Sequence, residues 1–489
     1  MASIIHKMKK GRPYYYAVQS ARVNGKPRIV WQKYLGTVEA IVARAEGSKP
    51  PKPKEAVLFE AGGVAALLRI AQRLELLEAI DAAAPKRGQG PSVGHYIVLA
   101  ALNRALAPCS KLAIGDWYEQ TVLRRLWGFD KTAFSSQRFW DHMSLVSEAA
   151  IETIQEALVP RIRREFGLDA EVFLYDTTNF FTFLSTANDR CTLAQRGHSK
   201  AKRHDLRQVG LALLATREFQ IPLFHQVYDG NIPDVGLFPA LAQKLIARHR
   251  AACGAKGQAT LVFDKGNVCE DAMEQLVVAR QPFVAALPLN RLPELAKTPL
   301  DQFQQIPALA GTKALTAEAE AWGASCRAAL VYTESFFTQQ LAGVTHHLVK
   351  CQKKLMDLEK SLRKWRGKRP TVRQVQASVH AILSAQFMSE LFEVAVAEEK
   401  GIPALHYAVD HAALDRLTQQ HLGRTLLLAF RTQGDAHDLI GAYRSLTEIE
   451  DAFKNMKNVD FLRWQPAYHW TNQKLKVHGL YCVLALLLA

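Results

Sequence analysis

Hydrophobic periodicity divides the chain into a helical part and an α/β part. From about residue 60 to 165, apolar residues recur every three or four positions, as in VAALLRIAQRLELLEAI and EAAIETIQEALVPRIRREF, with breaks at Pro85, Pro91 and Pro108. This period predicts a domain of amphipathic helices over residues 56–165. After it, short apolar runs predict three strands (EVFLYD, VGLALLAT, IPLFHQVY), a helix (LFPALAQKLIARHR), a fourth strand (TLVFD), a second helix (EDAMEQLVVAR) and a fifth strand (FVAAL).

The order of these elements predicts a fold. Three strands, a helix, then strand–helix–strand is the order of a ribonuclease-H-like α/β core, and residues 166–290 supply it. In such a core the first and fourth strands lie side by side. Asp176 and Asp264 end those two strands, so we expect their carboxylates to meet. An aspartate after a strand is by itself usually a helix cap or turn residue. The pair of them on neighbouring strands indicates a site.

A third carboxylate lies near the end of the chain, within residues 436–489, which we expect to complete the core. Tyr443, Glu450 and Lys457 recur every seven residues in YRSLTEIEDAFKNMK. Seven residues of an α-helix return to within about 20° of the same face. One helix face should therefore carry a carboxylate between a phenol and an ammonium. Lys454, four residues after Glu450, could instead form an ordinary surface ion pair with it.

Residues 291–435 interrupt the predicted core as a mixed insertion. Apolar residues in alternating steps of three and four predict a long helix there: Leu341, Val344, Leu348, Cys351, Leu355, Leu358, Leu362 and Trp365. A helical hairpin packed on itself and a dimer seam both explain this repeat. The distal part is basic, with ten Lys or Arg against two acids over residues 350–373. LFEVAVAEE, ALHYAVD and TLLLAFRT predict strands.

Charge is concentrated at the N-terminus. The 489-residue chain carries a formal charge of +16, and residues 1–54 hold twelve Lys or Arg against two Glu. Within PYYYAVQSARVNGKPRIVWQKYLG, the pair Asn24-Gly25 predicts a hairpin turn between two strands. Arg22, Lys26 and Arg28 alternate there with Tyr and Trp, a combination that can hold phosphates and stack on bases. A solvated hairpin whose aromatics pack on its neighbour is the alternative. The Pro- and Lys-rich SKPPKPKE closes this module near residue 55.

Several protein classes are disfavoured. The longest apolar run, GLYCVLALLLA, is too short to span a bilayer, and no apolar stretch resembling a signal peptide opens the chain. The seven cysteines form no C-x-x-C pair, which disfavours a zinc finger or disulfide framework. A P-loop and a dinucleotide fingerprint are absent from the sequence. We therefore expect a cytoplasmic protein with reduced thiols, no membrane partner and a polyanionic ligand.

The three carboxylates predict a metal-dependent reaction. Carboxylates brought together by a fold repel one another unless cations neutralise them, and oxygen-only ligands suit Mg²⁺ or Mn²⁺. Two such ions can activate a water or 3′-hydroxyl for in-line displacement at a phosphodiester. Asp176 would bridge both ions, with Asp264 and Glu450 each holding one. Lys457 would hold a DNA phosphate, and Tyr443 could donate to another.

These residues resemble the DDE transposases of bacterial insertion sequences, in the branch around insertion sequence 4. That branch carries Tyr-x₂-Arg-x₃-Glu-x₆-Lys on the Glu-bearing helix, and Tyr443, Glu450 and Lys457 fall on its positions. Leu446 occupies the Arg position, and Arg444 lies close to it in sequence but on a different side of the helix. LYDTTNFFTF, RGHSKAKRHDLRQVGLAL, VFDKGN and RWQPAYHWTNQKLKVHGLYCVLALLL carry the rest of the resemblance, which covers roughly residues 165–489.

The resemblance implies a ribonuclease-H-like core split by a largely β insertion. It also implies Mg²⁺-dependent cleavage at terminal inverted repeats, synapsis by a homodimer, and strand transfer into target DNA in the bacterial cytoplasm. Further candidate DNA contacts are Lys454, Arg444, Lys200, Lys202 and Arg203. Related chains usually continue past the position of Ala489. The alternatives are an inactive or domesticated DNA-binding relative, and a ribonuclease-H-like nuclease without strand transfer.

Overall fold

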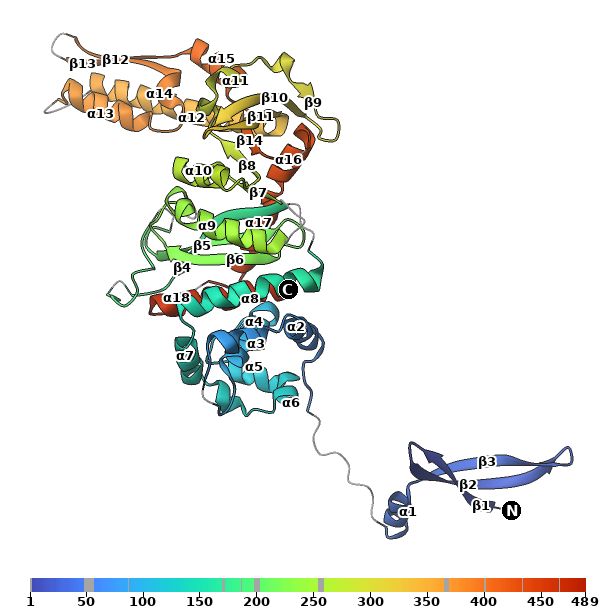
Figure 1. Cartoon of the computed structure of the whole chain (residues 1–489). Helices are drawn as coiled ribbons and strands as arrows, with labels where there is room; N and C mark the ends of the chain where they lie inside the picture. The colour runs from blue at the N-terminus through green and yellow to red at the C-terminus, as the bar shows by residue number, and fades with distance from the viewer. Residues whose placement is uncertain are drawn as a thin grey trace. The chain divides into compact units, whose positions relative to one another are not determined.

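The protein consists of two compact units, Met1–Phe59 and Glu60–Ala489, each described here by itself (Figure 1). The computed structural model describes residues 2–47, 57–86, 88–168, 172–185, 187–197, 203–253, 259–364, 369–399, 402–432, 434–465 and 467–489. The predicted linker SKPPKPKE lies wholly outside these residues.

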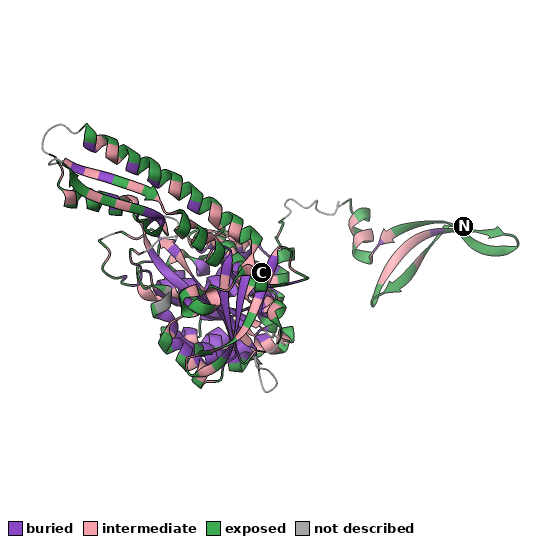
Figure 2. Ribbon diagram, turned by 90° about the horizontal axis from the view of Figure 1, so that it is seen from above, coloured by how far each residue is buried: buried purple, intermediate pink, exposed green. Residues whose placement is uncertain are grey.

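The first unit is a small antiparallel sheet followed by one helix. Its elements are β1 (Ala2–Lys9), β2 (Arg12–Val23), β3 (Lys26–Gly36) and α1 (Val38–Ala45). The predicted turn is confirmed, because Asn24 and Gly25 both have positive φ (51° and 77°), as a tight two-residue hairpin turn requires. Strand β1 was missed, since the sequence predicted only two strands. Among the described residues of this unit, Val18 is the one buried large apolar side chain (Figure 2).

The predicted helices are present at the start of the second unit, where they share one hydrophobic core with the strands that follow them. The helices are α2 (Gly62–Arg73), α3 (Leu76–Ala83), α4 (Val93–Leu106), α5 (Ile114–Gln120), α6 (Leu123–Trp127), α7 (Ser136–Ser144) and α8 (Glu148–Phe166). Pro85 and Pro91 fall between α3 and α4, and Pro108 falls between α4 and α5. Proline has no backbone amide proton to donate within a helix, so these positions are favoured between helices.

The five predicted core strands form one half of a nine-stranded mixed sheet. They are β4 (Val172–Thr182), β5 (Arg207–Thr216), β6 (Pro222–Asp229), β7 (Thr260–Phe263) and β8 (Phe283–Leu287), with α9 (Asp234–Cys253) and α10 (Glu270–Val278) between them in sequence. Their spatial order is β6-β5-β4-β7-β8. The first and fourth strands, β4 and β7, are parallel neighbours, as the order of elements predicted.

One face of this half-sheet packs on α9. The Tyr175 ring of β4 and the Phe263 ring of β7 each lie 4.9 Å from the ring of Phe238 in α9. Side chains alternate between the faces of a strand, so the next residues, Asp176 and Asp264, point to the opposite face.

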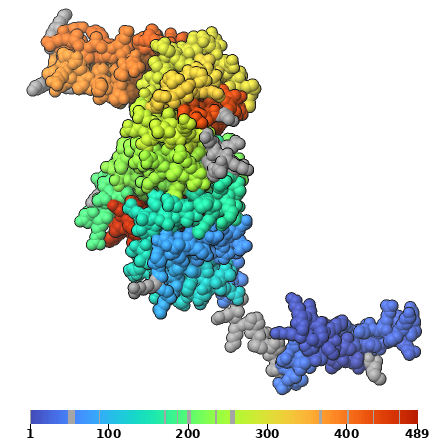
Figure 3. Space-filling view, viewed as in Figure 1, coloured from blue at the N-terminus to red at the C-terminus, as the bar shows by residue number. Residues whose placement is uncertain are grey.

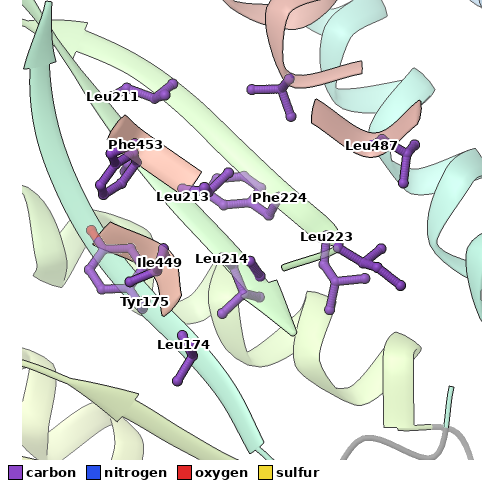
Figure 4. Packing of buried hydrophobic residues seen from close by; sticks show 14 of the residues in the cluster. Leu174, Tyr175, Leu211, Leu213, Leu214, Leu223, Phe224, Ile449, Phe453 and Leu487 are labelled. Carbon is purple, nitrogen blue, oxygen red and sulfur yellow. The ribbon is translucent and has the colours of Figure 1, made fainter. Parts of the chain in front are cut away.

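That opposite face is covered by α17 (Leu446–Lys457). Ile449 and Phe453 of α17 are buried among leucines of β4 and β5, including Leu213, which pairs with Asp176 across the strands (Figure 4). Because these two apolar residues anchor the helix, the neighbouring Glu450 is held beside the face that carries both aspartates.

The insertion is divided between the sheet and an arm. Strands β14 (Arg424–Phe430), β11 (Ala324–Thr333), β10 (Thr312–Ala321) and β9 (Gln304–Gln305) continue the sheet beyond β8. The short helix α11 (Pro293–Ala296) precedes them. Of these strands the sequence predicted only β14. The core and part of the insertion therefore share one sheet, which periodicity did not indicate.

The arm, orange in Figure 3, has its own small hydrophobic core. It consists of α12 (Glu334–Arg363), α13 (Val372–Ile382), α14 (Met388–Leu391), the ribbon β12 (Phe392–Glu399) and β13 (Ile402–Val409), and α15 (His411–Gln420). The heptad residues from Leu341 to Leu362 all pack in this core. The apolar residues of the repeat are thus buried within one chain, against α13 and the ribbon. Trp365, the last residue of the predicted repeat, lies outside the described residues.

The last elements return to the core and the helical domain. They are α16 (Ala436–Arg444), α17 and α18 (Asn472–Leu488). Helix α18 is buried on nearly all sides and lies so close to β6 that a Cβ at Gly479 would come within 2.6 Å of Val227. Across the described residues, we find no helix with the length and apolar character needed to cross a membrane.

Candidate functional site

Asp176 and Asp264 lie at the same level of the sheet, on two neighbouring parallel strands. The last parallel pair between β4 and β7 is Tyr175 with Phe263, and each aspartate follows directly. The expectation that β4 ends at Asp176 is wrong, because the strand continues to Thr182. Its antiparallel partner β5 supports it beyond the point where β7 turns away at Asp264. The pairing between β4 and β7, and not strand β4 itself, therefore ends just before the two aspartates.

The predicted single helix around Glu450 is broken at Ser445. Tyr443 belongs to α16, whereas Glu450 and Lys457 belong to α17. The Ser445 hydroxyl donates to the carbonyl of Ala442 (2.6 Å), the local side-chain-to-backbone bond by which serine competes with helix continuation. The seven-residue repeat therefore does not correspond to one continuous face.

Tyr443 lies at the centre of the candidate site. Its hydroxyl donates to Asp264 Oδ1 at 2.8 Å. Burial raises the pKa of the Tyr443 phenol far above its usual value, and the charges and hydrogen bond of Asp264 raise it further, as do the charges of Asp176 and Glu450. Each of the three predicted carboxylates therefore raises the pKa of this one phenol, which stays protonated and remains a hydrogen-bond donor.

The three carboxylates face the same region without touching. Their oxygens do not all lie within 4.8 Å of one another. Asp176 and Asp264 are half-buried and Glu450 is exposed, so the glutamate has room to move away from two like charges. All three offer oxygen ligands, the type that hard divalent cations such as Mg²⁺ and Mn²⁺ prefer.

Another acidic group does meet that distance. Among the described residues, Asp435, His437 and Asp438 place ligand atoms within 4.8 Å of one another, and all are exposed. Asp435 and Asp438 form the capping box of α16, each side chain accepting from the other's backbone amide. Helix capping accounts for this cluster.

Lys457 lies on the same sheet face as the aspartates. Its ammonium donates to Thr178 Oγ1 at 2.6 Å and lies 5.4 Å from the ring centroid of Phe180. Thr178 is two residues beyond Asp176, on the same side of β4. Lys454 does not form the expected pair with Glu450, because its ammonium bonds Asp451 Oδ1 at 2.7 Å.

Other predicted DNA contacts have local partners. Arg444 donates to Thr312 Oγ1 of β10 at 2.9 Å, which ties α16 to the inserted strands. Arg203 forms a two-pronged pair with Asp205 (2.9 and 2.8 Å), and this guanidinium lowers the Asp205 pKa to about 2. Lys200 and Lys202 lie outside the described residues.

The N-terminal cations lie at the exposed tip of the β2–β3 hairpin. Lys26 and Arg28 pair with Val23 and Ala21, so they share one sheet face, and Arg22 points to the other. The Trp31 side chain shares the face of Lys26 and Arg28 and is 49% exposed. Both cations and aromatics of this unit are therefore accessible, as the sequence suggested.

Lys265 was not among the site residues predicted from the sequence. This exposed residue follows Asp264 directly and lines a cavity of about 680 Å³ together with Asp264 and Tyr443. Lys265 makes no ion pair or side-chain hydrogen bond to another described residue. Burial lowers the pKa of His421 on the insertion side of the cavity, and the Lys265 charge lowers it further. Its position in VFDKGN, next to the second aspartate, was the available signal.

The far wall of this cavity comes from the insertion. Phe336 and Gln340 of α12 and Phe387, which precedes α14, face the same space as Asp264. Phe387 has a positive φ of 68°, uncommon for an aromatic residue. The root of the arm therefore closes the cavity that opens beside the carboxylates.

Comparisons with known proteins find a distant structural likeness. No family model matches the sequence, and no curated protein matches it. A solved structure described as a piggyBac transposase synaptic complex with hairpin DNA aligns with 86% of this chain and 71% of its own, at 9% identity and a TM-score of 0.36.

Proposed function

We propose that this protein is a DDE transposase, which cuts DNA at the ends of its element and transfers them to target DNA. One observation carries the proposal: Asp176 and Asp264 follow the last parallel pair of adjacent strands, and their charges and that of Glu450 on α17 all act on the Tyr443 phenol. A ribonuclease-H-like core is supported by the strand order β6-β5-β4-β7-β8 with β4 and β7 parallel.

Asp176, Asp264 and Glu450 would hold the Mg²⁺ or Mn²⁺ ions. When bound, two such ions supply an activated water or 3′-hydroxyl and stabilise the leaving oxygen of the phosphodiester. Asp176 sits in the middle of a fully paired strand, so its carboxylate is the most rigidly placed of the three. Glu450 is exposed on a helix and is the one free to adjust.

The surrounding residues orient the site and its substrate. Tyr443 donates to Asp264 and thereby leaves the other oxygen of that carboxylate available. Lys457 and Lys265 place positive charge on the two sides of the aspartate pair, where they can hold phosphates of the bound strand. The first unit would add contacts through Arg22, Lys26 and Arg28, and synapsis of two ends would require a homodimer.

DNA cleavage by the full chain tests the proposal. The substrate is a duplex that carries the inverted repeats flanking the gene, incubated with Mg²⁺ and a target plasmid. We expect metal-dependent cuts at the repeat ends and joined products. The matched control is Asp271→Asn, an exposed aspartate on α10 outside the site.

The possible products separate the alternatives. End cleavage without joining would indicate a nuclease that lacks strand transfer. Specific binding to the repeats without cleavage at any Mg²⁺ or Mn²⁺ concentration would indicate an inactive DNA-binding relative. Cleavage that persists in Asp176→Asn would contradict the assignment of the carboxylates.

A further inference from the structure

Helix α12 has two faces of opposite character. Its apolar face packs in the core of the arm through Val344, Cys351, Leu355 and Leu362. At 100° per residue, the five lysines Lys350, Lys353, Lys354, Lys360 and Lys364 fall within an arc of about 120° centred on the opposite side. All five are exposed, and Figure 2 shows the long helix with an exposed outer surface. We call these five residues the lysine stripe.

No ammonium group of the lysine stripe is paired with a carboxylate of the described residues. None of the five ammonium groups makes a hydrogen bond or ion pair there, and the one ion pair of the distal helix joins Arg363 to Glu359. Asp357 is the single acid within the arc. Exposed helix faces usually alternate in sign, which lets neighbours compensate. A run of one sign repels itself and costs stability unless a partner neutralises it.

We propose that the lysine stripe is a second DNA-contact surface, which holds the phosphate backbone of duplex flanking the cleavage site. The inference rests on the proposed function. Lys350 to Lys364 spans about 21 Å along the helix, the length of about six base pairs. Lysines act as flexible point charges and impose no base geometry, so this contact is independent of sequence.

The geometry of the arm supports flanking DNA as the occupant. The root of α12, at Phe336 and Gln340, lines the cavity beside Asp264, so the helix begins at the carboxylate site and leads away from it. A backbone bound along the stripe would therefore continue from the site. A second copy of this chain is the other possible occupant, through the exposed glutamates of the ribbon. Glu399 is paired with His406, so Glu393 and Glu398 remain, which offer little against five lysines.

Salt-dependent binding by the full chain tests the lysine stripe. The variant replaces Lys350, Lys353, Lys354 and Lys360 by Gln, at exposed helical positions that tolerate the change. Binding is measured without divalent metal, on a duplex that extends well beyond the cleavage position. Each lost phosphate contact lowers the slope of log K against log salt by about 0.9, so we expect the slope to fall by about 3 to 4.

Two controls separate this contact from a structural effect. Asp357→Asn removes the single acid from the arc and should move binding the other way, to higher affinity. On a short duplex ending at the cleavage position, the quadruple variant should bind as the unmodified chain does. An unchanged salt slope on the long duplex would overturn the lysine stripe as a DNA contact.

The remaining outcomes identify where an error lies. Loss of self-association in both the lysine variant and Glu393→Gln/Glu398→Gln, with DNA affinity intact, would overturn the inference in favour of a second copy. Failure of the unmodified chain to bind any duplex would overturn both this inference and the proposed function. Binding by the unmodified chain with an equal slope in the variant would overturn only the inference.

Discussion

The nine-stranded core sheet and the three-stranded N-terminal sheet differ in what they bury. In the core sheet, strands β5 and β8 are buried almost throughout, and helices pack against the faces that they form with β4 and β7. In the N-terminal sheet, Val18 is the one buried large apolar side chain among the described residues. Both sheets have regular pairing, so hydrogen bonding alone does not explain the difference. A sheet buried on both faces can hold carboxylates rigidly, whereas an exposed one keeps its cations and aromatic rings available to a partner.

The aromatic residues illustrate the contrast. Trp464 is fully buried and stacks on Phe180 with ring centroids 4.3 Å apart. Trp31 and Tyr34 of the first unit are each about half exposed, and Tyr34 packs mainly on other tyrosines such as Tyr16 (5.2 Å). Burial of the first pair stabilises the fold, while the second group leaves apolar area free for binding.

The largest expected effect concerns the rigid sheet. Asp176→Asn, Asp264→Asn and Glu450→Gln should each reduce Mg²⁺-dependent cleavage by about 1000-fold or more, a barrier increase of about 4 kcal/mol. DNA affinity measured without metal should not fall, because these carboxylates repel phosphate and their loss removes no attractive contact. Cleavage rates and binding isotherms on the same duplex check this. Full activity in any variant would remove that residue from the site.

A second change compares tryptophans in the two sheets. Trp464→Ala should lower the free energy of unfolding of the second unit by about 3 to 5 kcal/mol, because it leaves a cavity beside Phe180. Trp31→Ala should change the stability of the first unit by less than about 1 kcal/mol and weaken DNA binding instead. Denaturant unfolding monitored by circular dichroism tests both. Equal destabilisation by the two changes would contradict the contrast in burial.

Acid should lower the stability of the second unit more than that of the first. Burial lowers the pKa of His225 and of His249 in the second unit to about 4, while an unfolded chain keeps the usual value near 6.5. The unfolded state binds more protons between these values, so stability falls as pH drops from about 6.5 to 4, by up to about 3 kcal/mol for each histidine. Unfolding titrations across this range measure the loss.

The control for the acid effect replaces a buried imidazole by a phenyl ring, which fills similar space and cannot bind a proton. His225→Phe should make the stability of the second unit less dependent on pH. The first unit, whose His6 is exposed, should show no matching loss. An unaltered pH profile in His225→Phe would rule out that histidine as a source of the acid sensitivity.

A smaller effect is expected at Tyr443. Tyr443→Phe removes the donor to Asp264 and keeps the ring. Hydrogen bonds that orient metal ligands are typically worth about 10- to 100-fold in metal affinity or activity, so half-saturation by Mg²⁺ should shift to higher concentration by about that factor. Metal titration of the cleavage rate is the measurement. No shift, with normal folding, would make Tyr443 a packing residue only.

The smallest effect concerns one face of the exposed sheet. Lys26→Gln/Arg28→Gln should lower the salt slope of DNA binding by about 2, one contact for each charge. Arg22→Gln, on the opposite face, should change the slope less if the face with Trp31 meets the backbone. Equal slopes in all variants and the unmodified chain would remove the hairpin from the DNA interface.

Local chemistry explains what could be predicted. The Asn24-Gly25 turn, the helices separated by Pro85, Pro91 and Pro108, and the five core strands follow from conformational preference and short-range periodicity. The neighbouring positions of Asp176 and Asp264 also followed from the order of elements. The break at Ser445 did not, since a serine is common inside helices and its bond to Ala442 is one of several options.

The sequence by itself determined which residues could carry the chemistry: two aspartates after strands, a glutamate beside apolar anchors, and clusters of exposed cations. Only the tertiary structure decided which of them act together. It brought the Tyr443 hydroxyl to Asp264 and the Lys457 ammonium to Thr178, placed Lys265 in the cavity beside Asp264, and joined the inserted strands to the core sheet. The physical reason is that charge pairing and strand adjacency depend on distances between residues far apart in the chain, which local periodicity does not encode.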